Sequence, residues 1–209
     1  RCRPTPRPPR RHRRARMSAI DLSAELGLAA LFLLALNLLL GLMISVRWQW
    51  RPTTLFQLHN WTGYIALGAC VLHPLPLLVS ARMRFTWLQI LWPVNAPSQA
   101  VENVIGALGL YLVALVVVTS YFRAQLGRKS WKLIHYLAYI AAALFFAHSY
   151  LLDPELRNQP VDFFDAEKVF VWVCFLLVAV ASLARWKYGQ RHPQRLRITP
   201  KTQYVPGFK

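Results

Sequence analysis

Residues 55–80 read LFQLHNWTGYIALGACVLHPLPLLVS and contain no Asp, Glu, Lys or Arg. About 20 apolar residues in a helix cross the roughly 30 Å hydrocarbon core of a membrane, so this stretch is long enough to span it. It nevertheless carries His59 and His73. An ionisable side chain inside a bilayer costs free energy and is by default a functional hypothesis. The stretch therefore predicts a membrane span with a site inside it.

Four more apolar stretches of similar length flank this one, at approximately 25–46, 101–122, 131–152 and 166–188. Over the whole chain, 56% of the 209 residues are hydrophobic and only 16% are charged. These values exclude an ordinary soluble domain. Unbroken apolar runs also differ from the short alternating strands of a membrane barrel. We predict an all-α, polytopic transmembrane helical bundle with five spans.

The chain divides into three parts. Residues 1–16 hold eight Arg, four Pro and no acidic residue, residues 17–188 hold the spans, and residues 189–209 form a basic tail. The prolines argue against an amphipathic targeting helix, and no apolar signal segment follows. We expect the leader to be disordered or not native, either translated upstream of Met17 or the remnant of a fragment that lacks a preceding span.

Charged residues predict the orientation of the spans. Three groups of basic residues share one side: Arg47 and Arg51, the four basic residues at 123–132, and the seven after Ala184. Residues 153–168, in contrast, hold five acids and two bases. The positive-inside rule then places the C-terminus in the cytoplasm. We expect an integral protein of a bacterial inner membrane, surrounded by the lipid bilayer. The formal charge of +17 reflects this topology, so we expect no nucleic-acid partner.

The fourth span also holds two histidines, His135 and His148, thirteen positions apart, against fourteen for His59 and His73. The second and fourth spans cross the membrane in the same direction, which puts His59 level with His135 and His73 level with His148. At 1.5 Å per residue, the levels lie roughly 20 Å apart. Two imidazoles can fill both axial positions of a heme iron, whereas zinc or copper would want more ligands per level. The sequence predicts two b-type hemes.

Small residues separate the two histidines on the second span. Positions 59, 63, 66, 70 and 73 fall within about 40° of one line on a helix, and they read His59, Gly63, Ala66, Cys70 and His73. Gly63 and Ala66 leave room for a porphyrin, although such residues also permit close helix packing. We count both among the candidate cofactor-binding residues.

Four local features are left for the structure to decide. Thirteen residues of ideal helix turn the two histidines of the fourth span about 140° apart, so a tightened stretch or different rotamers must absorb the difference. Pro74 and Pro76 should kink or end the second span. Asn37 is expected to bond a neighbouring helix or a heme propionate, and residues 81–100, which include Trp87 and Trp92, are expected to lie at the membrane interface.

A His-x13-His span followed two spans later by a His-x12-His span resembles the ferric reductase-like transmembrane domain. Ferric reductases, NADPH oxidases and the heme subunit of the bacterial methionine sulfoxide reductase system share this domain. The words LHNWTG at 58–63 and GRKSWKLIH at 127–135 agree with it, and the resemblance covers roughly residues 22–188. It implies electron transfer from a cytoplasmic flavin or quinol donor to an acceptor on the opposite side. His59 and His135 would ligate the inner heme, and His73 and His148 the outer one.

Two departures from the family leave alternatives open. Family members commonly have six spans, and full-length reductases and oxidases continue into FAD and NAD(P)H domains, whereas no glycine-rich nucleotide loop occurs here. We expect FAD or FMN on a flavoprotein partner or an absent domain, or a quinol donor. One alternative is a heme subunit that delivers electrons to a periplasmic reductase, such as methionine sulfoxide reductase. A ferric reductase-like protein and a heme subunit of this kind would both be oxidoreductase components.

A further alternative, from another class, is a transporter whose histidines relay protons or bind a metal. Such proteins usually carry an acidic residue inside a span. Here all eight acids lie at or beyond the ends of the apolar runs, which disfavours this class.

Overall fold

The computed structural model describes residues 18–46, 52–81, 84–152 and 165–191. All regular structure in these ranges is helical. The long helices are α1 (Ala19–Ser45), α2 (Pro52–Leu72), α4 (Ala100–Tyr121), α7 (Leu137–Leu151) and α8 (Ala166–Arg191). The short ones are α3 (Trp87–Leu91), α5 (Arg123–Leu126), α6 (Arg128–His135) and the 3-10 helices η1 (Leu75–Val79) and η2 (Pro93–Asn95). The expectations for residues 1–16 and for the tail beyond residue 191 lie outside the described residues.

Five segments of the described chain are long and apolar enough to cross a membrane: Ala19–Ser45, Thr53–Val79, Ala100–Tyr121, Arg128–Leu151 and Ala166–Arg191. This confirms the predicted all-α bundle. The first span begins six residues earlier than predicted, because Ser18 and Asp21 form a capping box. The Ser18 N–H donates to Asp21 Oδ2 (2.8 Å), and the Asp21 N–H donates to Ser18 Oγ (3.1 Å).

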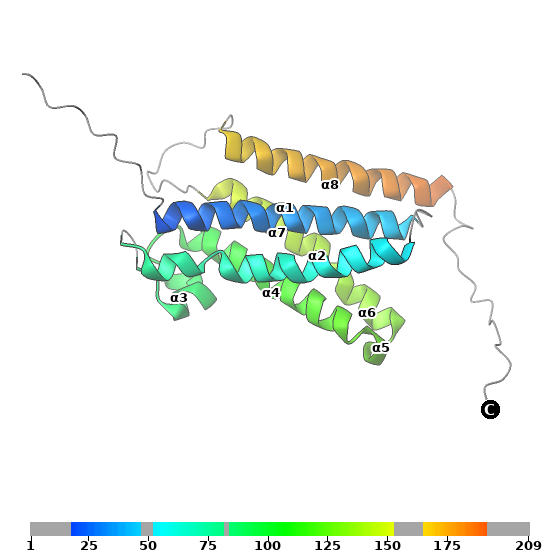
Figure 1. Ribbon diagram of the computed structural model, residues 1–209, viewed down its shortest axis with the longest axis horizontal. Coiled ribbons are helices and arrows are strands. Elements are labelled where there is room, and N and C mark those ends of the chain that lie inside the picture. Colours follow the sequence, from blue (N-terminus) through cyan, green and yellow to red (C-terminus); the bar gives the residue numbers. More distant parts are fainter. Residues whose placement is uncertain (1–17, 47–51, 82–83, 153–164, 192–209) are drawn as a thin grey trace, which may run out of the picture.

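The helix α1 is central to the bundle. It packs against α2, α7 and α8, while α4 lies along α6 and α7 (Figure 1). The buried core forms where α1, α7 and α8 meet and contains Leu31, Ala35, Ala142, Phe146, Val171, Cys174 and Val178. Large apolar side chains such as Trp61, Val118 and Leu177 remain exposed on the outside. An apolar exterior of this kind is what a helix bundle presents to lipid.

The α-helical part of the second span ends where the prolines predict. α2 stops at Leu72, and the His73 N–H still bonds to the Ala69 carbonyl (2.9 Å). Pro74 then begins a tighter turn, in which the Leu77 N–H donates to the Pro74 carbonyl (3.1 Å). Because proline has no N–H, the α-helical bonding pattern cannot continue through this segment. His73 is therefore the last residue held by the helix.

The fourth span is interrupted directly after His135. α6 ends there, Tyr136 forms a turn, and α7 begins at Leu137. The Tyr139 N–H bonds to the Tyr136 carbonyl, three residues back (3.1 Å), as in a 3-10 helix. A 3-10 turn advances about 120° per residue instead of 100°, which reduces the angular mismatch between His135 and His148. Of the two options left open by the sequence, a tightened stretch is therefore present, and at about 20° per tightened residue this turn accounts for part of the roughly 140° difference.

Residues 84–97 fold into a short capped helix followed by η2. Thr86 and Gln89 form the capping box of α3, and Gln89 Nε2 also donates to the Asn95 carbonyl (3.0 Å). The Tyr111 hydroxyl of α4 donates to the carbonyl of Leu91, which ties α3 to the bundle. Trp87 and Trp92 are exposed. Their position at a membrane interface stays a prediction.

Candidate functional site

The four histidines within the spans meet in two pairs. The ring centroids of His59 and His135 lie 6.2 Å apart with an angle of 72° between the ring planes. Those of His73 and His148 lie 6.1 Å apart at 71°. These are the pairs expected from the order of the spans. We call them the His59 level and the His73 level.

The separations fit one metal between each pair. An imidazole nitrogen binds a metal at about 2.0–2.1 Å, and the ring centre lies roughly 1.1 Å further back, so two rings on opposite sides of one metal have centres about 6.3 Å apart. Both observed distances are close to this value. The part of the chain that the structure describes contains no group of three or more His, Cys, Asp or Glu that could hold a bare metal ion. Two imidazoles would instead suffice to hold a heme iron, which accepts two such ligands.

Hydrogen bonds fix the tautomer of three of the rings. Nδ1 of His59 bonds to the carbonyl oxygen of Asn37 (3.0 Å), Nδ1 of His73 to that of Ser23 (2.9 Å), and Nδ1 of His148 to that of Glu102 (2.7 Å). A carbonyl oxygen only accepts, so each Nδ1 carries the proton. The lone pair of Nε2 is then left for a metal, as in most histidine ligands.

The fourth ring, that of His135, has a hydroxyl group and not a backbone carbonyl as its hydrogen-bond partner. Nδ1 of His135 lies 3.3 Å from Ser120 Oγ, and Trp131 Nε1 also donates to that oxygen (3.2 Å). The Trp131 ring stacks beside His135, with centroids 5.0 Å apart and an angle of 31°. Ser120 and Trp131 together hold His135 in place.

A glycine lies against each of the three carbonyl-bonded rings, four residues after the accepting residue. A Cβ at Gly27 would lie 3.1 Å from His73 Nδ1, and one at Gly41 would lie 3.2 Å from His59 Cε1. One at Gly106 would lie only 2.8 Å from both Nδ1 and Cε1 of His148. These rings therefore rest on bare backbone of α1 or α4, and a side chain at the glycine would displace them.

Reasoning from the sequence missed these glycines, although a signal was present. Gly27 and Gly41 are fourteen residues apart, the same interval as His59 and His73. α1 and α2 pack against each other in opposite directions, so equal intervals bring each glycine to one histidine. The matched spacing was therefore visible in the sequence, but not the adjacency of the two helices.

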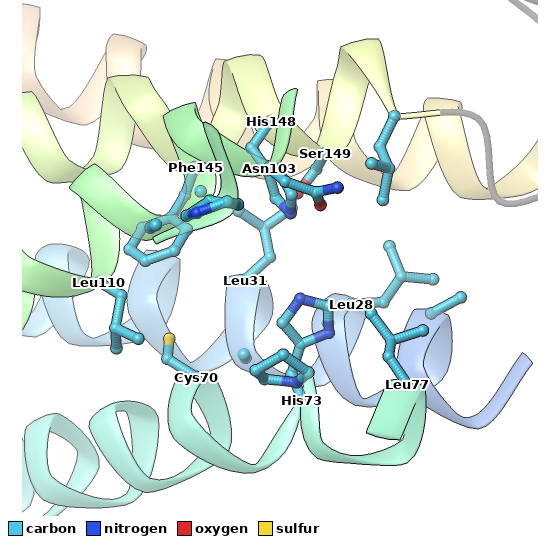
Figure 2. A pocket seen from close by; sticks show the side chains of 18 of the residues that line it. Leu28, Leu31, Cys70, His73, Leu77, Asn103, Leu110, Phe145, His148 and Ser149 are labelled. Atoms are coloured by element: carbon cyan, nitrogen blue, oxygen red, sulfur yellow. The ribbon is translucent and has the colours of Figure 1, made fainter. Parts of the chain in front are cut away.

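The His73 level opens on a cavity, and His73 and His148 both point into it (Figure 2). Its walls include apolar side chains such as Leu110 and Phe145, together with the thiol of Cys70. Polar side chains also line it, namely Gln89, Asn103, Ser149, Glu167 and Lys168. A cavity with two imidazoles, apolar walls and a few polar groups suits an amphipathic cofactor.

Asn37 bonds a neighbouring helix, one of the two outcomes expected for it. Its side-chain Nδ2 donates to the backbone carbonyl of His59 (2.5 Å) and to Thr62 Oγ1 (2.8 Å). The backbone carbonyl of Asn37 accepts a hydrogen bond from the His59 ring. A Cβ at Gly63 would lie 3.3 Å from that same Nδ2. Gly63 thus makes room for Asn37, and Ala66 is fully buried. A direct contact of either residue with a cofactor stays a prediction.

Replacing Asn37 by Ala should destabilise the α1–α2 pair. The substitution removes two partly buried hydrogen bonds from α2, each worth about 0.5–1.5 kcal/mol, so we expect a loss of about 1–3 kcal/mol in the free energy of unfolding. Thermal unfolding in detergent measures it. Gln57→Ala removes an amide from the exposed face of α2 and should change stability by less than about 0.5 kcal/mol. Equal effects of the two substitutions would contradict this role of Asn37.

Comparison with known proteins finds a family model that matches the chain. The family model described as ferric reductase like transmembrane component matches residues 26–146, which is more than half of the chain. The matched segment contains His59, His73 and His135 and ends two residues before His148. No curated protein and no solved structure matches the chain. Because the match covers most of the bundle that holds the histidine pairs, the chain belongs to the ferric reductase-like transmembrane family.

Proposed function

We propose that this protein carries electrons across the membrane through two bis-histidine b-type hemes, one at the His59 level and one at the His73 level. The family supports transmembrane electron transfer in general. The observation that carries the more specific proposal is the geometry of the two pairs, 6.2 and 6.1 Å between ring centroids. A heme bound at each level would supply a one-electron carrier.

The chain's own contribution is to hold and orient the ligands. The carbonyls of Ser23, Asn37 and Glu102 keep the proton on Nδ1, which leaves Nε2 of three imidazoles as the nitrogen that would bind the iron. The glycines of α1 and α4 let these rings lie close to the helix backbone. Both devices fix the rings before a cofactor binds, and such preorganisation lowers the free-energy cost of ligation.

The distribution of charge supports the direction of transfer. Basic residues lie beside the His59 level, in α5, α6 and the end of α8, and Arg185 Nε donates to Ser45 Oγ there (2.6 Å). Acidic residues such as Glu102 and Glu167 lie toward the His73 level. By the positive-inside rule, the His59 level is the cytoplasmic one. The donor in this proposal is a cytoplasmic flavoprotein or a quinol, and the acceptor lies on the opposite side.

Purified protein is expected to contain about two hemes b per chain, a stoichiometry measured by the pyridine hemochromogen assay against protein concentration. The dithionite-reduced spectrum should show a b-type α-band, and the ferric form should be low-spin because both axial positions are filled by imidazoles. Preparation in cells supplied with a heme precursor excludes simple heme shortage. Protein that is folded and helical but free of heme would refute the proposal.

A further inference from the structure

Lys168 is a buried lysine in the first turn of α8, with only 7% of its surface exposed. Burial of an ammonium group is costly unless it is paired and hydrogen-bonded. A cation in the first turn of a helix also opposes the dipole of that helix. The charges that predict the orientation of the spans do not explain why this lysine is buried, and the histidine pairs do not explain it either.

Three hydrogen bonds join Lys168 to another helix. Its Nζ donates to the carbonyl oxygens of Ser149 (3.0 Å), Tyr150 (2.7 Å) and Leu152 (2.7 Å). These groups belong to the C-terminal turn of α7, where carbonyls have no partner within the helix. The negative end of the α7 dipole also favours a cation there. Lys168 therefore caps α7 from α8.

The capped turn is the one that carries His148. Ser149 is the next residue in the chain, and the Leu152 N–H bonds to the His148 carbonyl (2.9 Å). Lys168 and His148 also line the same cavity at the His73 level. Among the residues that the structure describes, the other charged side chain that lines this cavity is Glu167. Removing the ammonium makes the electrostatic potential in the cavity more negative, whichever carboxylates face it.

We propose that Lys168 is a positioning residue of the His73 level, which fixes the α7 turn that carries His148 and raises the reduction potential of the cofactor bound there. This inference rests on the proposed function. A fixed positive charge favours the reduced state of a nearby redox group, and it does so more strongly in a medium of low dielectric. A higher potential at the His73 level favours the passage of an electron from the His59 level.

Two substitutions separate charge from geometry. Lys168→Gln keeps a donor for the carbonyls and removes the charge, whereas Lys168→Arg keeps both. Redox titration of each purified protein in nanodiscs, followed through the b-type absorbance, gives the potentials of the two levels. The transition that disappears in a His73→Ala/His148→Ala variant identifies the His73 level. Lys187→Gln removes the same charge from an exposed position at the other end of α8 and serves as the matched control.

We expect Lys168→Gln to lower the potential of the His73 level and to leave the other transition in place, while Lys168→Arg and Lys187→Gln keep the His73-level potential. Loss of the heme at that level in Lys168→Gln but not in Lys168→Arg would also support the proposal. An unchanged potential in Lys168→Gln, or an equal change in Lys168→Arg, would overturn it. Absence of heme from the unmodified protein would instead overturn the proposed function.

Discussion

A variant with both His73 and His148 replaced by Ala is expected to bind about one heme per chain instead of two and to transfer no electrons across the membrane. The two ring centroids lie 6.1 Å apart, so the double substitution would remove both proposed ligands of one level and none of the other. The remaining heme should stay low-spin, because His59 and His135 are intact. Heme content, the electron paramagnetic resonance spectrum and electron transfer in proteoliposomes are the measurements.

The companion variant removes one ligand from each level. In His59→Ala/His73→Ala, both substitutions lie on the second span, His59 within α2 and His73 directly after it, and no level keeps two imidazoles. We expect both hemes to be lost or to become high-spin, even though the number of histidines removed is the same. His192→Ala, in the basic tail, controls for general effects of losing a histidine. Equal spectra for the two double variants would show that the rings do not pair across α2 and the fourth span.

The pairing of the histidines followed from the sequence because it depends only on the order of the spans. Helices that differ by two in order run in the same direction, which puts His59 level with His135 and His73 level with His148, and the structure brings both pairs into contact. The break at Tyr136 could not be located, because the residues around it are compatible with a continuous helix. The sequence showed that the angular difference between His135 and His148 must be absorbed within these thirteen residues, but not where.

The surroundings of the rings were harder to predict than the rings themselves. Gly27, Gly41 and Gly106 act across helix pairs, and a glycine in an apolar span has many possible reasons that the sequence alone does not separate. Lys168 lies in a segment where charges were counted as topology signals, and its burial depends on where the end of α7 lies relative to α8. These contacts depend on tertiary packing, which periodicity and spacing do not encode.

Replacement of Gly106 by Ala is expected to remove the heme of the His73 level. The new Cβ would lie 2.8 Å from Nδ1 and Cε1 of His148, too close for any side-chain contact, so the ring must move away from the Glu102 carbonyl that it bonds. Overpacking of this kind costs about 1–3 kcal/mol, and the lost hydrogen bond adds about 0.5–1.5 kcal/mol. Heme content and thermal unfolding of the purified variant test the prediction.

Gly68 provides a matched control within the same bundle, because it lies on the exposed face of α2 and a Cβ there meets nothing within 4 Å. Glycine to alanine in a helix interior is intrinsically favourable by roughly 0.5–1 kcal/mol at either position. The difference between Gly68→Ala and Gly106→Ala therefore isolates the contact with His148. We expect Gly68→Ala to keep both hemes and to melt at the same temperature or higher. If Gly106→Ala also keeps both hemes and the melting temperature, the close contact of His148 with α4 is not needed to hold the ligand.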